Sequence, residues 1–380
     1  MGAGVSYRCG VDCLDGNDAV LLGRRVGLIT NPSAVTADFT PTVEVLASNY
    51  KLAALFGPEH GVRGDAQAGV AVGDNVSCAY GVPEYSLYGA TRRLQREWLD
   101  QVEVVVFDIQ DIGSRYYTYI YTMGLALADC AAAGIPFVVL DRPNPLGGLK
   151  AEGVLIRPEF HSFVGNYGLS VRHPLTVGEM AQRINRIEAH NCDLTVVQCS
   201  GWQRQPLGDE TSWINPSPNM PSLTTALVYN GTCLFEATNI SEGRGTTRPY
   251  ELIGAPFIEH EHLATTMNSQ GLAGVHFRPC CFTPTFDKHM GQLCRGVQLH
   301  VTDREAFNGF AAGVSLFQAI REQTPQMEIT SAGHLNNLFG SDSLLKGRES
   351  LQMLLARAER ESAEFVVEAE QDHLYVRSNR

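Results

Sequence analysis

The sequence predicts an α/β protein that has a doubly wound parallel sheet, followed by a smaller α+β domain. Over the first two-thirds of the chain, short apolar runs rich in β-branched residues alternate with segments of helical composition. Runs of this kind are typical of parallel strands buried on both faces, and the helical segments supply the crossovers between them. The pattern changes after Ala255-Pro256, which predicts a second domain.

Six apolar runs are expected to form the strands of the first domain, residues 1–255, and three segments between them its helices. Gly134 followed by Pro136 is a typical C-terminal stop for the second of these helices. The predicted strands are residues 25–30, 51–56, 102–109, 135–141, 194–200 and 231–238, and the predicted helices are residues 40–48, 123–134 and 176–187.

The second domain, residues 256–380, is expected to combine an antiparallel or mixed sheet with helices. Two segments rich in apolar and β-branched residues predict strands, two predict helices, and the last segment is predicted to be extended. The predicted strands are residues 274–287 and 295–303, the helices are residues 304–323 and 343–363, and the extended segment is residues 365–378.

Charge and hydropathy exclude several classes of partner. The net charge of −12 argues against nucleic acid, whose phosphates require a concentrated basic surface. No apolar stretch approaches the length of a membrane span. The N-terminus lacks a basic segment followed by an apolar one, so we expect a cytoplasmic protein or an exported one whose leader is absent from this numbering. The oligomeric state is not indicated.

Polar and charged residues follow five of the six predicted strands. In open α/β sheets, ligands bind outside the carboxyl ends of the strands, so these residues are expected to form one site. They combine carboxylates, arginines, amides and an aromatic side chain. The candidate site residues are Glu59, His60 and Arg63, then Asp108, Asp111, Arg115 and Tyr116, then Asp141, Arg142 and Asn144, and finally Asn239, Glu242 and Arg244.

Familiar catalytic signatures are absent from the chain. There is no H-E-x-x-H, no G-x-S-x-G, no Walker-type phosphate loop and no G-x-G-x-x-G after the first strand. Their absence argues against a zincin, an α/β-hydrolase, a P-loop enzyme and a Rossmann dehydrogenase, in that order. His60, His161 and His173 are widely spaced, so we expect no metal and no cofactor. Several acidic residues without a metal motif are what glycosidic cleavage requires.

Seven long segments carry a family resemblance. They are LFGPEHGVRGDAQAG (55–69), SLYG (86–89), FDIQDIGSRYYTYIYTM (107–123), LDRPNPLGG (140–148), SFVGNYGLSVRHPLTVGEMA (162–181), residues 214–256 and CRGVQLHVTDREAF (294–307). These segments resemble the bacterial exo-β-N-acetylmuramidases, a family of peptidoglycan-sugar glycoside hydrolases formerly known as a domain of unknown function. The resemblance covers nearly the whole chain.

The resemblance implies a fold, an activity and a catalytic residue. It implies a Rossmann-like domain whose cleft is closed by the smaller C-terminal domain. It also implies release of N-acetylmuramic acid from the non-reducing end of peptidoglycan fragments in cell-wall turnover, with a peptidoglycan-derived sugar or muropeptide as the partner. The family's proposed catalytic glutamate, in its G-P-E-H-G motif, falls on Glu59.

Carboxylates are therefore the expected catalytic groups. Glu59 is assigned as general acid/base, the alternative being a carboxylate that caps the next helix. Asp108 or Asp111 would be a second catalytic carboxylate or a sugar-hydroxyl acceptor, although a structural turn aspartate is an equal alternative for each. The same two interpretations apply to Glu242.

Arginines and tyrosines are the expected substrate-binding groups. Muramic acid carries a lactyl carboxylate, which an arginine can bind through two hydrogen bonds, and we favour Arg63 or Arg244 for this role. The alternative is that the arginines neutralise neighbouring aspartates. Tyr116 belongs to the core or to a sugar-stacking wall, and His60 either orients Glu59 or is structural.

Two rival functions remain. One is a non-catalytic muropeptide- or glycan-binding protein on the same fold, since fold does not fix function. The other is a lyase on the lactyl ether or a hydrolase of another acidic amino sugar. A binding protein would hold its ligand without turnover, which separates the first rival from an enzyme. The mass of the products separates the second, since ether cleavage leaves lactate and hydrolysis leaves intact muramic acid.

Overall fold

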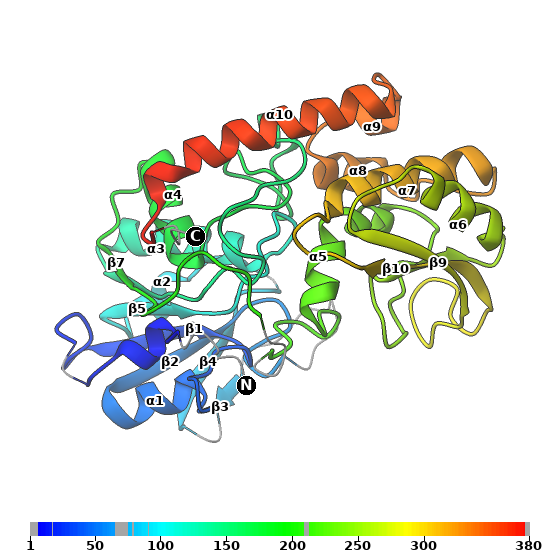
Figure 1. Cartoon of the computed structure of the whole chain (residues 1–380). Coiled ribbons are helices and arrows are strands. Elements are labelled where there is room, and N and C mark those ends of the chain that lie inside the picture. Colours follow the sequence, from blue (N-terminus) through cyan, green and yellow to red (C-terminus); the bar gives the residue numbers. More distant parts are fainter. Residues whose placement is uncertain are drawn as a thin grey trace, which may run out of the picture.

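The computed structural model describes residues 7–16, 18–64, 75–77, 80–89, 91–208 and 213–376. They form a large sheet with helices on both faces and a smaller sheet with its own helices (Figure 1). Within the described ranges, no helix is long and apolar enough to cross a membrane.

The large sheet has seven strands in the order β3-β4-β2-β1-β5-β6-β7. All neighbouring pairs are parallel except β3 and β4. The strand order reverses at β1, which pairs with β2 on one side and β5 on the other, so the predicted doubly wound α/β fold is confirmed. The strands are β1 (Arg25–Thr30), β2 (Lys51–Gly57), β3 (Asn75–Ser77), β4 (Val82–Ser86), β5 (Val104–Asp108), β6 (Phe137–Leu140) and β7 (Leu194–Val197).

Alternating side chains of the strands build two cores, one on each face of the sheet. Leu28 and Val106 lie in one apolar cluster with Leu46 of α1. Phe107 points to the other face and joins a larger cluster, which includes Met180 of α4. The helices on the two faces are α1 (Thr42–Asn49), α2 (Arg96–Leu99), α3 (Tyr119–Ala133) and α4 (Val177–Ile187). The predicted stop of α3 is confirmed, since Gly134 caps it in the left-handed region at φ 69°.

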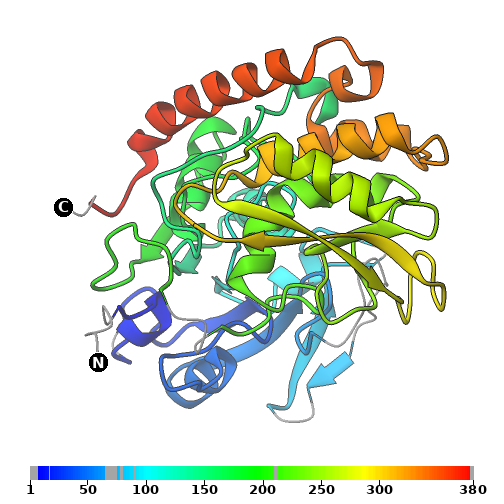
Figure 2. The same cartoon turned by 45° about the vertical axis from the view of Figure 1, so that its right-hand side comes forward.

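The smaller sheet is antiparallel, with the order β8-β10-β9. Helix α6 covers this sheet, and α7 packs on α6; Figure 2 brings this part of the molecule forward. The elements are α5 (Leu223–Thr232), the 3-10 helix η3 (Cys233–Ala237), β8 (Leu252–Ala255), α6 (His260–Ser269), β9 (Val275–Phe282), β10 (Cys294–Val301), α7 (Gly309–Gln323), α8 (Ala332–Phe339) and α9 (Ser343–Lys346).

The strand predicted at residues 231–238 is wrong. These residues form the end of α5 and the following η3. Nearly every residue of the two helices is buried, the polar ones of α5 included, so no exposed face marks a helical period, and a short helix of that kind cannot be distinguished from a buried strand by periodicity. Ser222, which caps α5 by accepting a hydrogen bond from the Thr225 amide, is the local signal for the helix.

The extended segment predicted at residues 365–378 is also wrong over its described part. Residues 365–369 continue α10 (Leu351–Ala369), and the 3-10 helix η4 (Glu370–Asp372) follows; residues 377 and 378 lie outside the described residues. The buried side chains of α10, which include Ala358, Ser362 and Phe365, recur every three or four positions. This helical spacing outweighs the preference of its two valines for strands.

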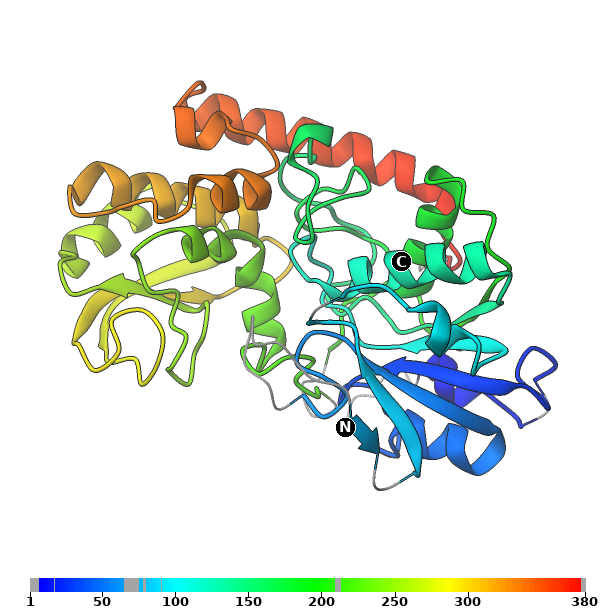
Figure 3. The same ribbon diagram turned by 180° about the vertical axis from the view of Figure 1, so that it is seen from behind.

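Contacts across the chain bear on the division predicted at residue 255. β8 ends there but pairs with β10, and α5 packs against α7. We propose that the division precedes α5, so that α5 to α9 form the second unit. Helix α10 then returns from the second unit to the first, where its end lies beside α4; Figures 1 and 3 show this crossing from two sides.

Candidate active site

A cavity of about 420 Å³ lies between the carboxyl edge of the large sheet and the second unit. Its walls come from loops after β2, β4 and β5 on one side, and from α5, η3, α8 and the loops flanking β8 and β9 on the other. The lining residues are Glu59, His60, Tyr88, Arg92, Tyr116, Tyr117, Thr118, Tyr119, Phe163, Val164, Ser217, Asn219, Met220, Tyr229, Glu236, Glu242, Arg244, Tyr250, Asp287, Lys288 and His334.

Glu59 is presented to the cavity by a tight turn at the end of β2. The next two residues, His60 and Gly61, adopt positive φ values of 72° and 76°, which reverse the chain immediately after the strand. Thr118 Oγ1 donates a 2.7 Å hydrogen bond to Glu59 Oε2. Burial and the charge of Glu59 raise the pKa of the Tyr88 phenol to about 12, so Tyr88 stays protonated beside the carboxylate.

Tyrosines form the floor of the cavity. Tyr117 and Tyr119 meet edge to face with their ring centroids 4.9 Å apart, and Tyr229 and Tyr250 do so at 4.7 Å. Burial raises the pKa of the Tyr116 phenol, which keeps it neutral. These rings are core residues whose edges reach the cavity, so Tyr116 packs in the core, and a sugar-stacking role for it stays a prediction.

The second unit contributes a cluster of charged residues. Arg244 is ion-paired with Glu236 at 2.8 Å and with Glu242 at 3.1 Å. Lys288 Nζ lies 2.8 Å from a Glu242 oxygen and also donates to two backbone carbonyls. Burial acts to lower the pKa of the Arg244 guanidinium, but the neighbouring phenol and carboxylates outweigh it and raise that pKa.

Glu236 is a carboxylate of this cluster whose pKa is lowered. Burial by itself raises that pKa, but the hydrogen bond with His334 and the charge of Arg244 lower it to about 2. The Tyr250 hydroxyl donates a further 2.7 Å hydrogen bond to Glu236 Oε1. The carboxylate is therefore ionised at neutral pH.

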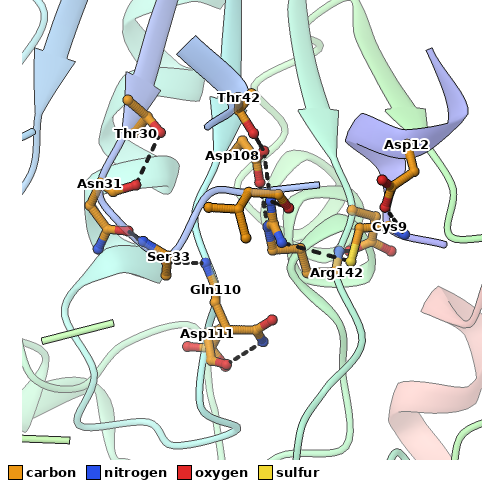
Figure 4. Close-up of polar contacts among 12 residues, drawn as sticks. Cys9, Asp12, Thr30, Asn31, Ser33, Thr42, Asp108, Gln110, Asp111 and Arg142 are labelled. Carbon is orange, nitrogen blue, oxygen red and sulfur yellow. Dashed lines mark hydrogen bonds and ion pairs between the residues drawn. The ribbon is translucent and has the colours of Figure 1, made fainter. Parts of the chain in front are cut away.

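Of the residues predicted for the site, the structure brings five to the cavity: Glu59, His60, Tyr116, Glu242 and Arg244. Asp108 and Arg142 are not among them. They form a buried ion pair of 2.5 Å below the sheet edge, and Thr42 donates to the same carboxylate (Figure 4). The two charges neutralise each other, which corresponds to the alternatives of a structural aspartate and of an arginine that neutralises it.

Three more predicted residues hold the backbone of the loops. Asp111 Oδ2 accepts a 2.7 Å hydrogen bond from the Gly113 amide. The Asn144 side-chain amide donates to the backbone carbonyls of His173 and Leu175. Arg115 is fully buried. Its guanidinium donates to four backbone carbonyls, those of Val154, Leu169, Leu338 and Phe339.

The remaining predicted residues lie elsewhere. Asp141 is buried and accepts hydrogen bonds from Thr176, Tyr375 and the Gly178 amide, and burial raises the pKa of its carboxyl. Asn239 joins its loop to the segment before α8, through Gln326 and Glu328. Arg63 is exposed and does not line the cavity.

Sequence reasoning missed several residues that line the cavity, notably Tyr88, Arg92, Thr118, Glu236 and His334. Glu236 lies in the run that was predicted to be a strand. Tyr88 belongs to the SLYG motif, and Thr118 to the motif that follows β5, so the resemblance contained a signal for both. Within the described part of the chain, no three His, Cys, Asp or Glu side chains are grouped so that they could hold a metal ion.

Comparisons with known proteins agree on one family. The N-terminal model of the exo-β-N-acetylmuramidase NamZ family matches residues 26–224, and its C-terminal model matches residues 227–375. Peptidoglycan β-N-acetylmuramidase NamZ of Bacillus subtilis (strain 168) is 50% identical over 326 residues, which cover 84% of this chain and 79% of that protein.

Two solved structures share the fold. Both are DUF1343 family proteins from Bacteroides fragilis NCTC 9343. The first has a TM-score of 0.90 and 33% identity, covering 98% of this chain and 99% of its own. The second has a TM-score of 0.79 and 25% identity, covering 98% and 100%. With both family models matched in order and a relative at 50% identity, this chain belongs to the exo-β-N-acetylmuramidase NamZ family.

Proposed function

We propose that this protein is an exo-acting glycoside hydrolase that releases N-acetylmuramic acid from the non-reducing end of peptidoglycan fragments, with Glu59 as its general acid/base. The family assignment and the 50% identical peptidoglycan β-N-acetylmuramidase support the reaction. The observation that carries the role of Glu59 is its place in the cavity, where Thr118 orients one carboxylate oxygen.

A second carboxylate is needed to stabilise the oxocarbenium-like centre or to activate water. We assign this role to Glu236, which faces the cavity from the second unit and whose lowered pKa keeps it charged. A site with one carboxyl group that exchanges a proton and one that stays ionised follows the usual division of labour in such enzymes. Asp108 and Asp111, the earlier candidates, are engaged in buried structural contacts.

The experiment is incubation of the purified protein with N-acetylmuramyl-β-1,4-N-acetylglucosamine, with products identified by mass spectrometry. The wild type should release intact N-acetylmuramic acid, and Glu59→Gln should release little or none while its thermal unfolding is unchanged. Glu44→Gln, on the exposed side of α1, is the matched control and should retain full activity.

Each alternative outcome has a distinct meaning. Binding without turnover by the wild type would favour a glycan-binding protein, and free lactate would indicate ether cleavage. Full activity of Glu59→Gln would leave the reaction standing and remove Glu59 from it. Longer glycan fragments should yield only the single terminal sugar, because the action is from the chain end.

A further inference from the structure

Arg92 differs from the other strong cations that line the cavity. Arg244 is ion-paired with two glutamates, and Lys288 with one of the same two. Among the residues that the structure describes, no carboxylate lies within ion-pairing distance of Arg92. Its charge is therefore available to an anionic ligand.

Arg92 is exposed, and its guanidinium lies against two aromatic rings. Its central carbon lies 4.1 Å from the ring centroid of Phe163 and 5.4 Å from that of Tyr88. Stacking on aromatic faces fixes the plane of an arginine and leaves its edge N–H groups free to donate. A planar, fixed pair of donors is what a carboxylate binds best.

Arg92 is also close to the proposed acid. The Tyr88 hydroxyl interacts with both the Glu59 carboxylate and the Arg92 guanidinium, so a single phenol separates the two groups. In N-acetylmuramic acid, the lactyl ether on C3 is two ring positions from the anomeric carbon at C1. A sugar whose C1 lies at Glu59 would then carry its lactyl carboxylate on the same wall of the cavity.

We propose that Arg92, in cation–π contact with Tyr88 and Phe163, binds the lactyl carboxylate and is the residue that selects N-acetylmuramic over N-acetylglucosaminyl ends. The inference rests on the proposed function, and it replaces Arg63 and Arg244 as candidates. Arg63 lies outside the cavity lining, and Arg244 is already neutralised by glutamates. Arg92 is a specificity residue, and the proton transfer remains with Glu59.

The test compares two disaccharides that differ at the lactyl carboxyl group, which is charged in one and neutral in the other: N-acetylmuramyl-β-1,4-N-acetylglucosamine and its lactyl methylamide. Arg92→Gln should lower kcat/KM on the acid about tenfold to a hundredfold and leave kcat/KM on the neutral amide unchanged. For Arg92→Lys, kcat/KM on the acid should lie between the values of the wild type and of Arg92→Gln, because an ammonium keeps the charge but loses the paired donors.

The neighbouring Arg93 provides a matched control. It is ion-paired with Asp129 of α3 rather than lining the cavity, so Arg93→Gln should keep the preference of the wild type. Arg63→Gln should keep it as well. The proposal is overturned if Arg92→Gln lowers kcat/KM equally on both disaccharides, which would indicate a purely structural role. It is also overturned if kcat/KM falls on neither.

Failure of this inference can be separated from failure of the proposed function. If the wild type turns over neither disaccharide, the hydrolase assignment fails first. Calorimetry with free N-acetylmuramic acid and with N-acetylglucosamine then still tests Arg92. Preference of the wild type for the acid, lost in Arg92→Gln, supports the site, and equal binding of both sugars by both proteins contradicts it.

Discussion

The carboxylate of Asp108 is paired with the guanidinium of Arg142 at 2.5 Å, and both side chains are almost completely buried. Asp108 ends β5 and Arg142 follows β6, so the pair joins two neighbouring strands at the edge where a ligand site is expected. Figure 4 shows that Thr42 approaches the same carboxylate from α1. Two charges predicted for the site therefore belong to the framework of the sheet edge, and neither lines the cavity.

Asp108→Asn is accordingly expected to affect stability more than chemistry. Removing one partner of a buried pair leaves the other charge uncompensated, which costs about 3–5 kcal/mol of unfolding free energy. Urea denaturation measures this loss. Asp100→Asn, whose partner Arg96 is well exposed, is the control and should cost less than about 1 kcal/mol. A stable Asp108→Asn protein without activity would instead make Asp108 catalytic.

Much of the first domain could be predicted because local patterns there agree with the tertiary structure. The runs that form β1, β5 and β6 are apolar and rich in β-branched residues, and strands buried on both faces require this. The same rule produced the error at residues 231–238, where the burial is equally complete but the backbone is helical. Local sequence reports burial more directly than it reports backbone geometry.

The candidate site could be predicted only in part, for a different reason. Position at a strand end identified Glu59, Asp108 and Arg142 alike. Only tertiary distances show that Asp108 and Arg142 neutralise each other while Glu59 faces the cavity. Glu236 was missed because its role depends on Arg244 and on His334, which is 98 residues away in the chain.

Thr118→Val should reduce activity without unfolding the protein. The Thr118 hydroxyl donates the 2.7 Å hydrogen bond that orients the Glu59 carboxylate. A hydrogen bond to a charged group is worth about 1.5–3 kcal/mol, so kcat on the disaccharide should fall about tenfold to a hundredfold. Thr118→Ser retains the hydroxyl and should retain most of the activity. Equal rates for Thr118→Val and the wild type would exclude this orienting role.

Gly313→Ala should destabilise the second unit. Helices α5 and α7 approach so closely that a methyl group on Gly313 would overlap the backbone of Gly231. Overpacking of this kind costs about 1–3 kcal/mol, and thermal unfolding should show a lower Tm. Gly333→Ala is the control, because nothing lies near the added carbon and α8 gains a better helix former. Its Tm should be unchanged or slightly higher.

The lowered pKa of Glu236 predicts a distinct acid sensitivity. Because that pKa falls from its ordinary value of 4.5 to about 2, the ionised form stabilises the folded protein at neutral pH. This contribution is fully present above pH 4.5 and is lost as the pH falls toward 2. It amounts to something on the order of 3 kcal/mol.

The test is the difference between the unfolding free energies of the wild type and of Glu236→Gln, measured by denaturant titration. The titrations run between pH 6 and pH 2, a range that spans about two units on either side of the ordinary carboxyl pKa. The difference should shrink through this window, because only the wild type carries the carboxylate that becomes protonated. Glu364→Gln removes one exposed carboxylate from α10 and controls for net charge. Parallel curves for wild type and Glu236→Gln would mean that Arg244 and His334 do not hold Glu236 in its ionised form, and the role proposed for it as the charged carboxylate would fail with them.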